Sequence, residues 1–565
     1  MKRPVIAIIA IAFLLRLGAV MYGLPQSFGA DELVSVLGAF TILERGHLFG
    51  TDLVYLPPLF SYILTPFFGA FGVFGMIFGM FSGIAGFREY VIFHYENFLW
   101  VVRVISALFG AGTVAFVYLI GQRVISERVG FFAALFLAFS FMHVHESQIG
   151  RFWVPATFFI VAGAYALIRM REERSFKWYI LSALAIGLGF GIGYVPLILL
   201  PWFFLSHAGV CGGVPRDAKS MVRFFGDRKF LYGAGIIVFL VAVFSFANPY
   251  AFARQFGWLT AGAASVFGIE LSRLTQKAVG TDVLQNAGLF IYNLWSESPL
   301  LLIAGIAGLI GYARVYRRKR LISSLFLALP ALYGLGIVFG FHRIDWRFVL
   351  PVVPFLALGA AHAFFIVRDR WSGTISRMAL YACYATGLLV YAVWPTLSYT
   401  ALLQRSDTRT LAVRWIEEHA APGSTIVLDD YSVYVSMSAE SVRDLARYNA
   451  GGMDTRRKEI LAHPERGVSG SGWRVYEMNR LLGTDFDVAQ IHEGFIVYSY
   501  WHSAQRMEKE ERFARVPKTL VVSFWPASDV RDIRDLVNNP TDPEEMLRVV
   551  RRPGPYVEIY QITSE

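Results

Sequence analysis

Charged residues and cysteines are both scarce in this chain. Only 17% of its 565 residues are charged, 55% are hydrophobic, and two are cysteines. A soluble protein of this length would carry more charge, so the composition predicts a polytopic membrane protein. The cysteines, Cys211 and Cys383, lie outside the polar C-terminal part, so they imply no disulfide framework and leave the redox compartment open.

Several functional signatures are also absent. The sequence has no glycine-rich phosphate loop, zinc-finger spacing, nucleophile elbow or internal repeat. The glycines over residues 187–193 lie within an apolar run, where they indicate close helix packing rather than nucleotide binding. The net charge of +10 does not indicate nucleic acid, because the basic residues lie mostly between apolar segments.

Long apolar runs are the dominant feature that is present. Residues 4–24 can span a bilayer, and no small-residue cleavage site follows, so we expect an uncleaved anchor with Lys2 and Arg3 in the cytoplasm. Ten further runs follow along the chain. The eleven predicted membrane helices cover residues 4–24, 98–121, 129–147, 154–170, 178–193, 195–208, 230–247, 299–313, 321–341, 348–367 and 377–397.

One more apolar stretch, residues 58–81, contains Pro66 and many glycines and phenylalanines. If this stretch does not cross the membrane, the lysines and arginines concentrate in cytoplasmic loops; a single crossing would move the later basic clusters outside. The charge pattern therefore favours an interfacial or re-entrant segment. It lies in a first outer loop over residues 25–97, and a second long outer loop covers residues 248–298.

Eleven crossings place a polar C-terminal domain outside the cytoplasm. We expect residues 1–400 to form the membrane domain and residues 401–565 to form a small soluble α/β domain. Asp407 is placed to cap a helix over 408–419, and residues 449–472 are glycine-rich and charged, which is typical of a loop. The predicted strands cover residues 425–428, 495–500, 520–524 and 556–562.

The pair Asp31-Glu32 follows the first helix, at the outer membrane surface. A structural interpretation is available, because acids in the first turn of a helix over 31–44 interact favourably with its dipole. The functional interpretation is a general base that deprotonates an acceptor hydroxyl, or a ligand for a divalent metal ion on a lipid phosphate.

A second polar group lies at the outer end of the predicted helix 129–147. It comprises His143, His145, Glu146, Gln148 and Arg151. Such residues can simply reach towards lipid headgroups. Two histidines and a glutamate together are costly in a membrane segment unless they are used, so they are candidates for a substrate or metal site, although their spacing matches no known ligand pattern.

The third group is the short outer loop over residues 342–347. Arg343 and Arg347 run against the general charge bias, and a guanidinium can hold a phosphate through two hydrogen bonds. Trp346 could stack on a sugar. The alternative is an interfacial belt of aromatic and basic residues. The loop over residues 248–298, which contains Arg254, could hold the acceptor or the lipid tail, or simply lie on the membrane surface.

The order of short motifs is more specific than any one of them. In chain order they are Asp31-Glu32, Tyr55-Leu56-Pro57-Pro58, Arg103, Gly121-Gln122-Arg123, Arg151-Phe152-Trp153-Val154-Pro155 and Arg347-Phe348-Val349-Leu350-Pro351-Val352-Val353-Pro354. This order and topology resemble the GT-C glycosyltransferases, specifically the group of protein O-mannosyltransferases and lipid A aminoarabinose transferases. The resemblance covers roughly residues 5–400 and continues weakly beyond them.

The resemblance implies an inverting glycosyltransferase, a hexosyl- or pentosyltransferase, in the cytoplasmic membrane. Its partners would be a polyprenyl-phosphate-linked sugar donor and an extracytoplasmic protein, lipid or glycan acceptor of the cell envelope, with no nucleic acid. Asp31 would match the catalytic aspartate, with Glu32 beside it. Arg347, with Arg343, would hold the donor phosphate.

The chain also departs from the family pattern. Many relatives carry an acid just before the proline that is Pro155 here, where this chain has Val154, and the aminoarabinose transferases carry one where it has Leu56. A metal site could still be completed by His143, His145 or Glu146. The alternatives are a transporter or flippase, which would have broken helices and repeated halves, and a catalytically degenerate relative that acts as a binding protein.

Overall fold

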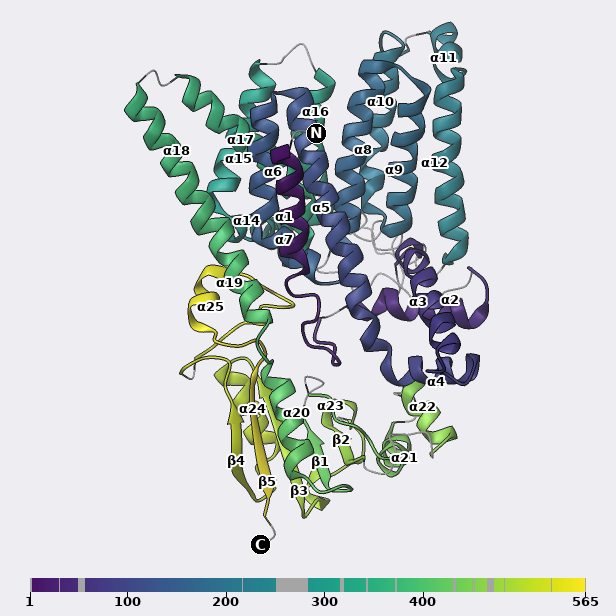
Figure 1. Ribbon diagram of the computed structural model, residues 1–565, viewed down its shortest axis with the longest axis vertical. Helices are drawn as coiled ribbons and strands as arrows, with labels where there is room; N and C mark the ends of the chain where they lie inside the picture. The colour runs from purple at the N-terminus through teal and green to yellow at the C-terminus, as the bar shows by residue number, and fades with distance from the viewer. Residues whose placement is uncertain are drawn as a thin grey trace. The chain divides into compact units, whose positions relative to one another are not determined.

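The chain divides into two compact units (Figure 1). Unit 1 comprises Met1–Val20, Asp31–Phe81 and Phe98–Leu397, and unit 2 comprises Met21–Ala30, Ser82–Asn97 and Ser398–Glu565. Unit 2 therefore takes in two segments of the predicted first outer loop. The computed structural model describes residues 3–29, 31–48, 56–215, 217–249, 283–315, 320–341, 344–370, 373–429, 433–449, 451, 453–464, 472–481, 483–529 and 531–563.

Unit 1 is built from helices. Its helices in the described residues are α1 (Arg3–Leu17), α2 (Glu32–Arg45), α3 (Leu59–Ile77), α5 (Leu99–Val124), α6 (Glu127–Phe139), α7 (Phe141–Gln148), α8 (Trp153–Glu173), α9 (Phe176–Ile192), α10 (Leu200–Val210), α11 (Ala218–Phe225), α12 (Arg228–Ala247), α14 (Val283–Glu297), α15 (Pro299–Val315), α16 (Arg320–Gly340), α17 (Val353–Arg370), α18 (Thr374–Leu388) and α19 (Trp394–Leu403), the last of which continues into unit 2. The 3₁₀ turns η2 (Val195–Leu199) and η4 (Trp346–Val352) precede α10 and α17, and the π-helical turn η5 (Leu389–Val393) joins α18 to α19.

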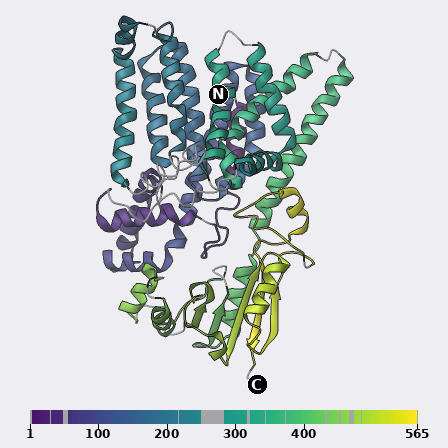
Figure 2. The same cartoon turned by 180° about the vertical axis from the view of Figure 1, so that it is seen from behind.

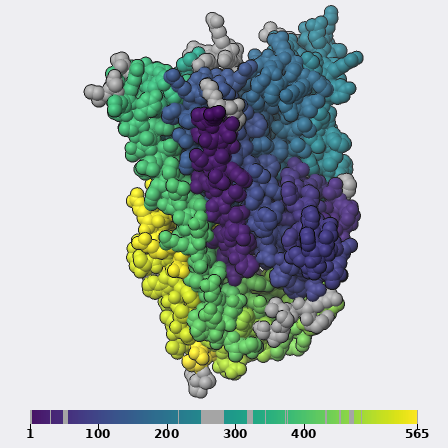
Figure 3. Space-filling view, in the orientation of Figure 1, coloured from purple at the N-terminus to yellow at the C-terminus, as the bar shows by residue number. Residues whose placement is uncertain are grey.

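Within the described residues, six helices are long and apolar enough to cross a membrane, or up to eight if each of two bent pairs is one span. The chain is therefore an integral membrane protein. The helices α5, α8 and α12 correspond closely to predicted spans. The first helix, by contrast, ends at Leu17 rather than at residue 24 and lies along the surface of unit 1 (Figure 3). By length and composition α3 could cross, so its re-entrant course stays a prediction.

The glycines of α9 serve close packing, as the sequence predicted. A Cβ atom added at Gly187 would lie 2.6 Å from Leu240 of α12, and one at Gly189 would lie 2.9 Å from Phe159 of α8. Those distances leave no room for a side chain. Figure 1 shows α8, α9 and α12 side by side. Because the glycines of α9 have no side chain, the neighbouring helices can approach α9 this closely.

The predicted helix 129–147 is in fact two helices, because α6 and α7 meet at Ser140 with a bend of 53°. The break frees carbonyls at the end of α6. Arg16 of α1, which is fully buried, donates to two of them, the carbonyl oxygens of Leu137 and Ala138, at 3.2 and 3.1 Å. A cation at a helix C-terminus is electrostatically favourable, and the pairing removes the cost of unpaired backbone groups in an apolar interior.

On the other side of the break, Glu297 contacts the start of α7. Its carboxylate accepts hydrogen bonds from the backbone N–H of Met142 at 2.8 Å and from the Ser140 hydroxyl at 2.6 Å. A carboxylate at the N-terminus of α7 interacts well with the helix dipole. Glu297 is the last residue of α14, a helix that the sequence did not predict and that is bent by 106° from α15 (Figure 2).

Replacing Glu297 with alanine should destabilise unit 1 by about 2–3 kcal/mol, because hydrogen bonds to a charged acceptor contribute about 1.5–3 kcal/mol each and the Met142 N–H would lose its buried partner. Glu297→Gln should lose less stability. The measurement is the thermal aggregation midpoint of the detergent-solubilised protein. Glu172→Ala, which removes an exposed ion pair with Arg123, is the control and should shift the midpoint little. Equal shifts would contradict the proposed role of Glu297.

Unit 2 is a small α/β fold. Its elements in the described residues, besides the end of α19, are α4 (Ile84–His94), η1 (Tyr95–Phe98), α20 (Thr408–His419), β1 (Thr425–Leu428), α21 (Ala439–Tyr448), α22 (Thr455–Ala462), β2 (Arg474–Glu477), α23 (Met478–Leu481), η7 (Val488–Gln490), β3 (Gly494–Tyr500), α24 (Ser503–Arg512), β4 (Lys518–Phe524), α25 (Pro543–Val549) and β5 (Tyr556–Ile562). The predicted helix and four predicted strands are confirmed. The segment 449–472 is not simply a loop, because α22 lies in it.

The five strands form one sheet in the order β2-β1-β3-β5-β4. The first three are parallel to one another, whereas β3–β5 and β5–β4 pair antiparallel. Ile426 and Leu428 of β1 are buried in the core together with Ile416 of α20. The Asp407 carboxylate accepts a hydrogen bond from the Arg409 backbone N–H at 2.9 Å, which caps α20 as predicted.

Candidate functional site

Asp31 is the residue just before α2, and its backbone is left-handed, with φ of 66°. Aspartate tolerates this conformation better than most residues. The side chain makes no capping hydrogen bond to α2. The carboxylate instead lies 3.2 Å from the guanidinium Nη2 of Arg347 and keeps 35% of its surface exposed. The Asp31 side chain therefore does not cap α2, although its place at the start of the helix is compatible with the predicted interaction with the helix dipole. Its carboxylate remains partly accessible.

Arg347 lies in η4, between α16 and α17. Its guanidinium Nη2 is 3.2 Å from both Asp31 and Asp345, and its side chain is 16% exposed. The neighbouring Trp346 is buried and packs edge-on against Phe141 of α7, so it is part of the core rather than a sugar platform. The structure thus brings together two residues from predicted loops 316 positions apart. Arg343 and Arg254 lie outside the described residues.

Glu32 has a different environment from Asp31. It is fully buried, and its two carboxylate oxygens accept hydrogen bonds from Nε and Nη2 of Arg103, each at 2.8 Å. One oxygen also accepts from the Gly150 N–H at 2.9 Å. Arg103 in turn donates to the Val20 carbonyl. Because both oxygens are engaged and shielded from solvent, the geometry does not support the prediction that Glu32 acts catalytically beside Asp31.

The polar residues of α7 are all buried, but they face different partners. His143 Nδ1 lies 2.9 Å from Nη2 of Arg16, at the helix break. Glu146 lies 3.2 Å from Arg151 and 3.2 Å from His145, and Arg347 is close enough to Glu146 to act on it electrostatically. Gln148 donates to the Leu15 carbonyl. The predicted group is therefore split: His143 faces Arg16 at the helix break, whereas Glu146 pairs with Arg151 and His145.

The predicted metal site does not assemble in the described part of the chain, where no three His, Cys, Asp or Glu residues gather in a way that could hold an ion. Asp31 and Asp345 flank Arg347, so a guanidinium occupies the position between these carboxylates. Among the described residues, the group around Arg347 therefore does not fit a divalent metal ion.

Sequence reasoning missed the supporting charges Arg16 and Glu297, and it named Arg103 only as part of a motif. The sequence could have indicated a role for Arg16, because a lone arginine within an apolar run of a membrane helix must find a buried partner. Glu297 was hidden because the helix that ends with it was assigned to an outer loop.

The fold and this group of residues define a helical integral membrane protein with an accessible carboxylate–arginine pair and a small α/β unit. The family model for dolichyl-phosphate-mannose-protein mannosyltransferases matches residues 90–211. This match confirms the resemblance to GT-C glycosyltransferases over that part of the chain.

Comparison with individual proteins gives more distant similarities. Dolichyl-phosphooligosaccharide-protein glycotransferase 2 of Pyrococcus furiosus is 24% identical over 178 residues, which are 30% of this chain and 23% of that protein. The oligosaccharyltransferase AglB of Archaeoglobus fulgidus, solved with an inhibitory peptide and a dolichol-phosphate, is 15% identical over 76% of this chain and 62% of its own, with a TM-score of 0.42. ArnT of Cupriavidus metallidurans, solved with undecaprenyl phosphate, is 13% identical over 98% of this chain and 97% of its own, with a TM-score of 0.44. The alignment with the Pyrococcus protein thus spans about a quarter of that relative.

Proposed function

We propose that this chain is a glycosyltransferase that moves a sugar from a polyprenyl-phosphate carrier to a hydroxyl group of an extracytoplasmic protein, lipid or glycan. The main support is the Asp31–Arg347 pair, which sets an accessible carboxylate against a cation that can bind phosphate. The match to the mannosyltransferase family model supports the same class of reaction. The proposal includes an N-terminus in the cytoplasm and a site at the outer face of the cytoplasmic membrane.

Each residue has a defined part in the proposed reaction. Arg347 exchanges its contact with Asp31 for the donor phosphate, whose two non-bridging oxygens can accept hydrogen bonds from both arms of the guanidinium. The freed Asp31 carboxylate then accepts the proton of the acceptor hydroxyl. The acceptor oxygen attacks the anomeric carbon as the bond to the phosphate oxygen breaks, so the configuration inverts. The electron pair leaves on the lipid phosphate, where Arg347 stabilises the added charge. No step passes through a metal ion.

The first experiment measures transfer from radiolabelled polyprenyl-phosphate sugars in membranes that contain the protein, with protein, lipid and glycan acceptors supplied in parallel. Arg347→Lys should lower kcat/KM about tenfold, because an ammonium keeps the charge but not the planar fork of donors. Arg368→Lys, whose guanidinium pairs with exposed Asp369, is the matched control and should leave transfer unchanged. No transfer by the wild type from any donor would refute the proposal.

A lipid flippase is the second candidate. The break between α6 and α7, lined by Arg16, His143 and Glu297, favours it, because transporters often build their sites at discontinuous helices. The same membranes distinguish the two functions. A flippase would move the lipid-linked donor across the bilayer and form no glycosylated acceptor, whereas a transferase forms that product.

A further inference from the structure

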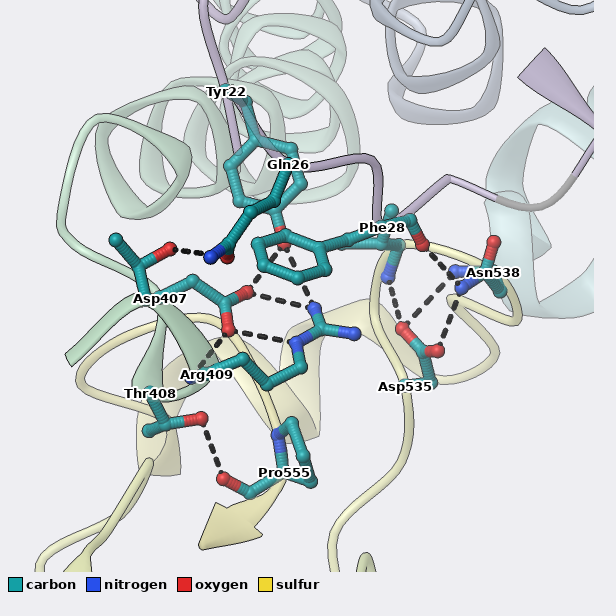
Figure 4. Close-up of polar contacts among 11 residues, drawn as sticks. Tyr22, Gln26, Phe28, Asp407, Thr408, Arg409, Asp535, Asn538 and Pro555 are labelled. Atoms are coloured by element: carbon teal, nitrogen blue, oxygen red, sulfur yellow. Dashed lines mark hydrogen bonds and ion pairs between the residues drawn. The ribbon is translucent and has the colours of Figure 1, made fainter. Parts of the chain in front are cut away.

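A short stretch of chain that leads into Asp31 belongs to unit 2. This stretch, residues 21–29, is named the N-terminal strap here. Figure 4 shows it lying over the start of α20. The Tyr22 hydroxyl donates to Asp407 at 2.7 Å, and the Arg409 guanidinium lies 3.7 Å from the centre of the Phe28 ring. Phe28 and Tyr22 are both buried.

The centre of this contact is a buried ion pair. Arg409 donates from Nε and Nη2 to the two oxygens of Asp407, each at 2.8 Å, and their side chains are 5% and 1% exposed. Nη2 of Arg409 also reaches the Tyr22 hydroxyl at 3.3 Å. The edge of the Arg409 guanidinium donates hydrogen bonds, and its face stacks on the Phe28 ring, so its orientation is fixed. The contacts of Arg409 in turn fix the side chains of Tyr22 and Phe28.

A second contact holds the backbone of the strap. Asn538 Nδ2 donates to the Phe28 carbonyl at 3.0 Å and to the Asp535 carboxylate at 2.8 Å (Figure 4). Three residues further on is Asp31. Three residues of extended chain reach about 10 Å at most, so a fixed Phe28 carbonyl limits the positions open to Asp31.

Unit 2 holds another segment in the same way. Arg456 of α22 donates to the carbonyls of Ile92 and Phe93, at the end of α4, at 3.1 and 2.9 Å. Its Nη2 also binds both carboxylate oxygens of Glu96, at 3.0 and 2.9 Å. This segment leads directly into α5, where Arg103 holds Glu32.

We infer that Arg409 and Arg456 are positioning residues, through which unit 2 fixes the two chain segments that lead into Asp31-Glu32 and into Arg103. This inference rests on the proposed function, because it assigns unit 2 the task of placing Asp31 for the reaction. Arg409 touches neither donor nor acceptor in this scheme. It acts on the turnover step through the strap.

The test combines amide hydrogen exchange with transfer kinetics on the full-length protein. Arg409→Ala should raise exchange over residues 21–29 at least tenfold and lower kcat about tenfold, while KM for the donor changes less than twofold. Arg409→Lys should recover part of both losses, and Tyr22→Phe should give a smaller change of the same kind. Arg456→Ala should raise exchange over residues 88–97.

The matched control is Arg457→Ala. Arg457 donates from Nη2 to both oxygens of Glu477 at 2.8 Å, and both side chains are 7% exposed. This buried ion pair joins α22 to β2 rather than to the N-terminal strap. If Arg457→Ala and Arg409→Ala lower kcat equally, general loss of stability explains the effect and the inference is overturned. Unchanged exchange over residues 21–29 in Arg409→Ala overturns it whatever the transfer result. Absence of transfer in the wild type overturns the proposed function instead, and the exchange data still report on the strap.

Discussion

Asp31→Asn should reduce the turnover of sugar transfer by about 10²–10⁴, the range that a positioned general base contributes. Asparagine has nearly the same shape and can still accept a hydrogen bond from Arg347, so the folded protein should remain. It cannot accept a proton from the acceptor hydroxyl. The measurement is kcat for transfer from the donor identified in membranes, at protein levels matched by quantitative immunoblot.

Asp345→Asn is the matched control for this prediction. Asp345 also lies 3.2 Å from Nη2 of Arg347 and is similarly exposed, at 40% against 35% for Asp31. It therefore reports the loss of a carboxylate that neutralises Arg347, without the loss of the proposed base. We expect Asp345→Asn to change kcat less than tenfold. Equal losses in the two variants would mean that both acids serve only to hold Arg347, and a different base would have to be sought.

Local patterns predicted much of the structure. The C-terminal helix and strands followed from capping and alternation, since Asp407 and the apolar residues of β1 act within a few residues of their own positions. The family resemblance placed Asp31 and Arg347 in one site, but their direct pairing was not predicted. Periodicity has no information on contacts between residues so far apart in the chain.

The predictions for the helix 129–147 and for Glu32 failed for the same physical reason, because both depend on contacts between distant parts of the chain. A helix break is invisible to hydrophobic periodicity when both halves are apolar, so the predicted helix 129–147 concealed the turn at Ser140. The stability of this turn depends on Arg16 and Glu297, which come from helices that are distant in the sequence. Likewise, Glu32 looked equivalent to Asp31 because it is adjacent in sequence. Only the fold shows that a helix start sends neighbouring side chains in different directions, one towards Arg347 and the other into the core.

Breaking the Glu32–Arg103 pair should cost about 3–5 kcal/mol, because either single alanine variant leaves an uncompensated buried charge. The two side chains are 0% and 2% exposed, so water cannot replace the missing partner. We expect Glu32→Ala and Arg103→Ala each to shorten sharply the half-life of the detergent-solubilised protein at a fixed elevated temperature, which is the appropriate measure where unfolding is irreversible.

The double variant separates a structural pair from two independent residues. Glu32→Ala combined with Arg103→Ala removes both charges, so its loss should be smaller than the sum of the single losses by about 1–3 kcal/mol. Arg123→Ala, which removes the exposed partner of Glu172, should cost less than about 1 kcal/mol. Additive losses would mean that the pair does not act as a unit. A coupled loss would explain why an acid that takes no part in proton transfer stands next to Asp31: it anchors the start of α2 to α5, and so holds the left-handed backbone that points the Asp31 carboxylate at Arg347.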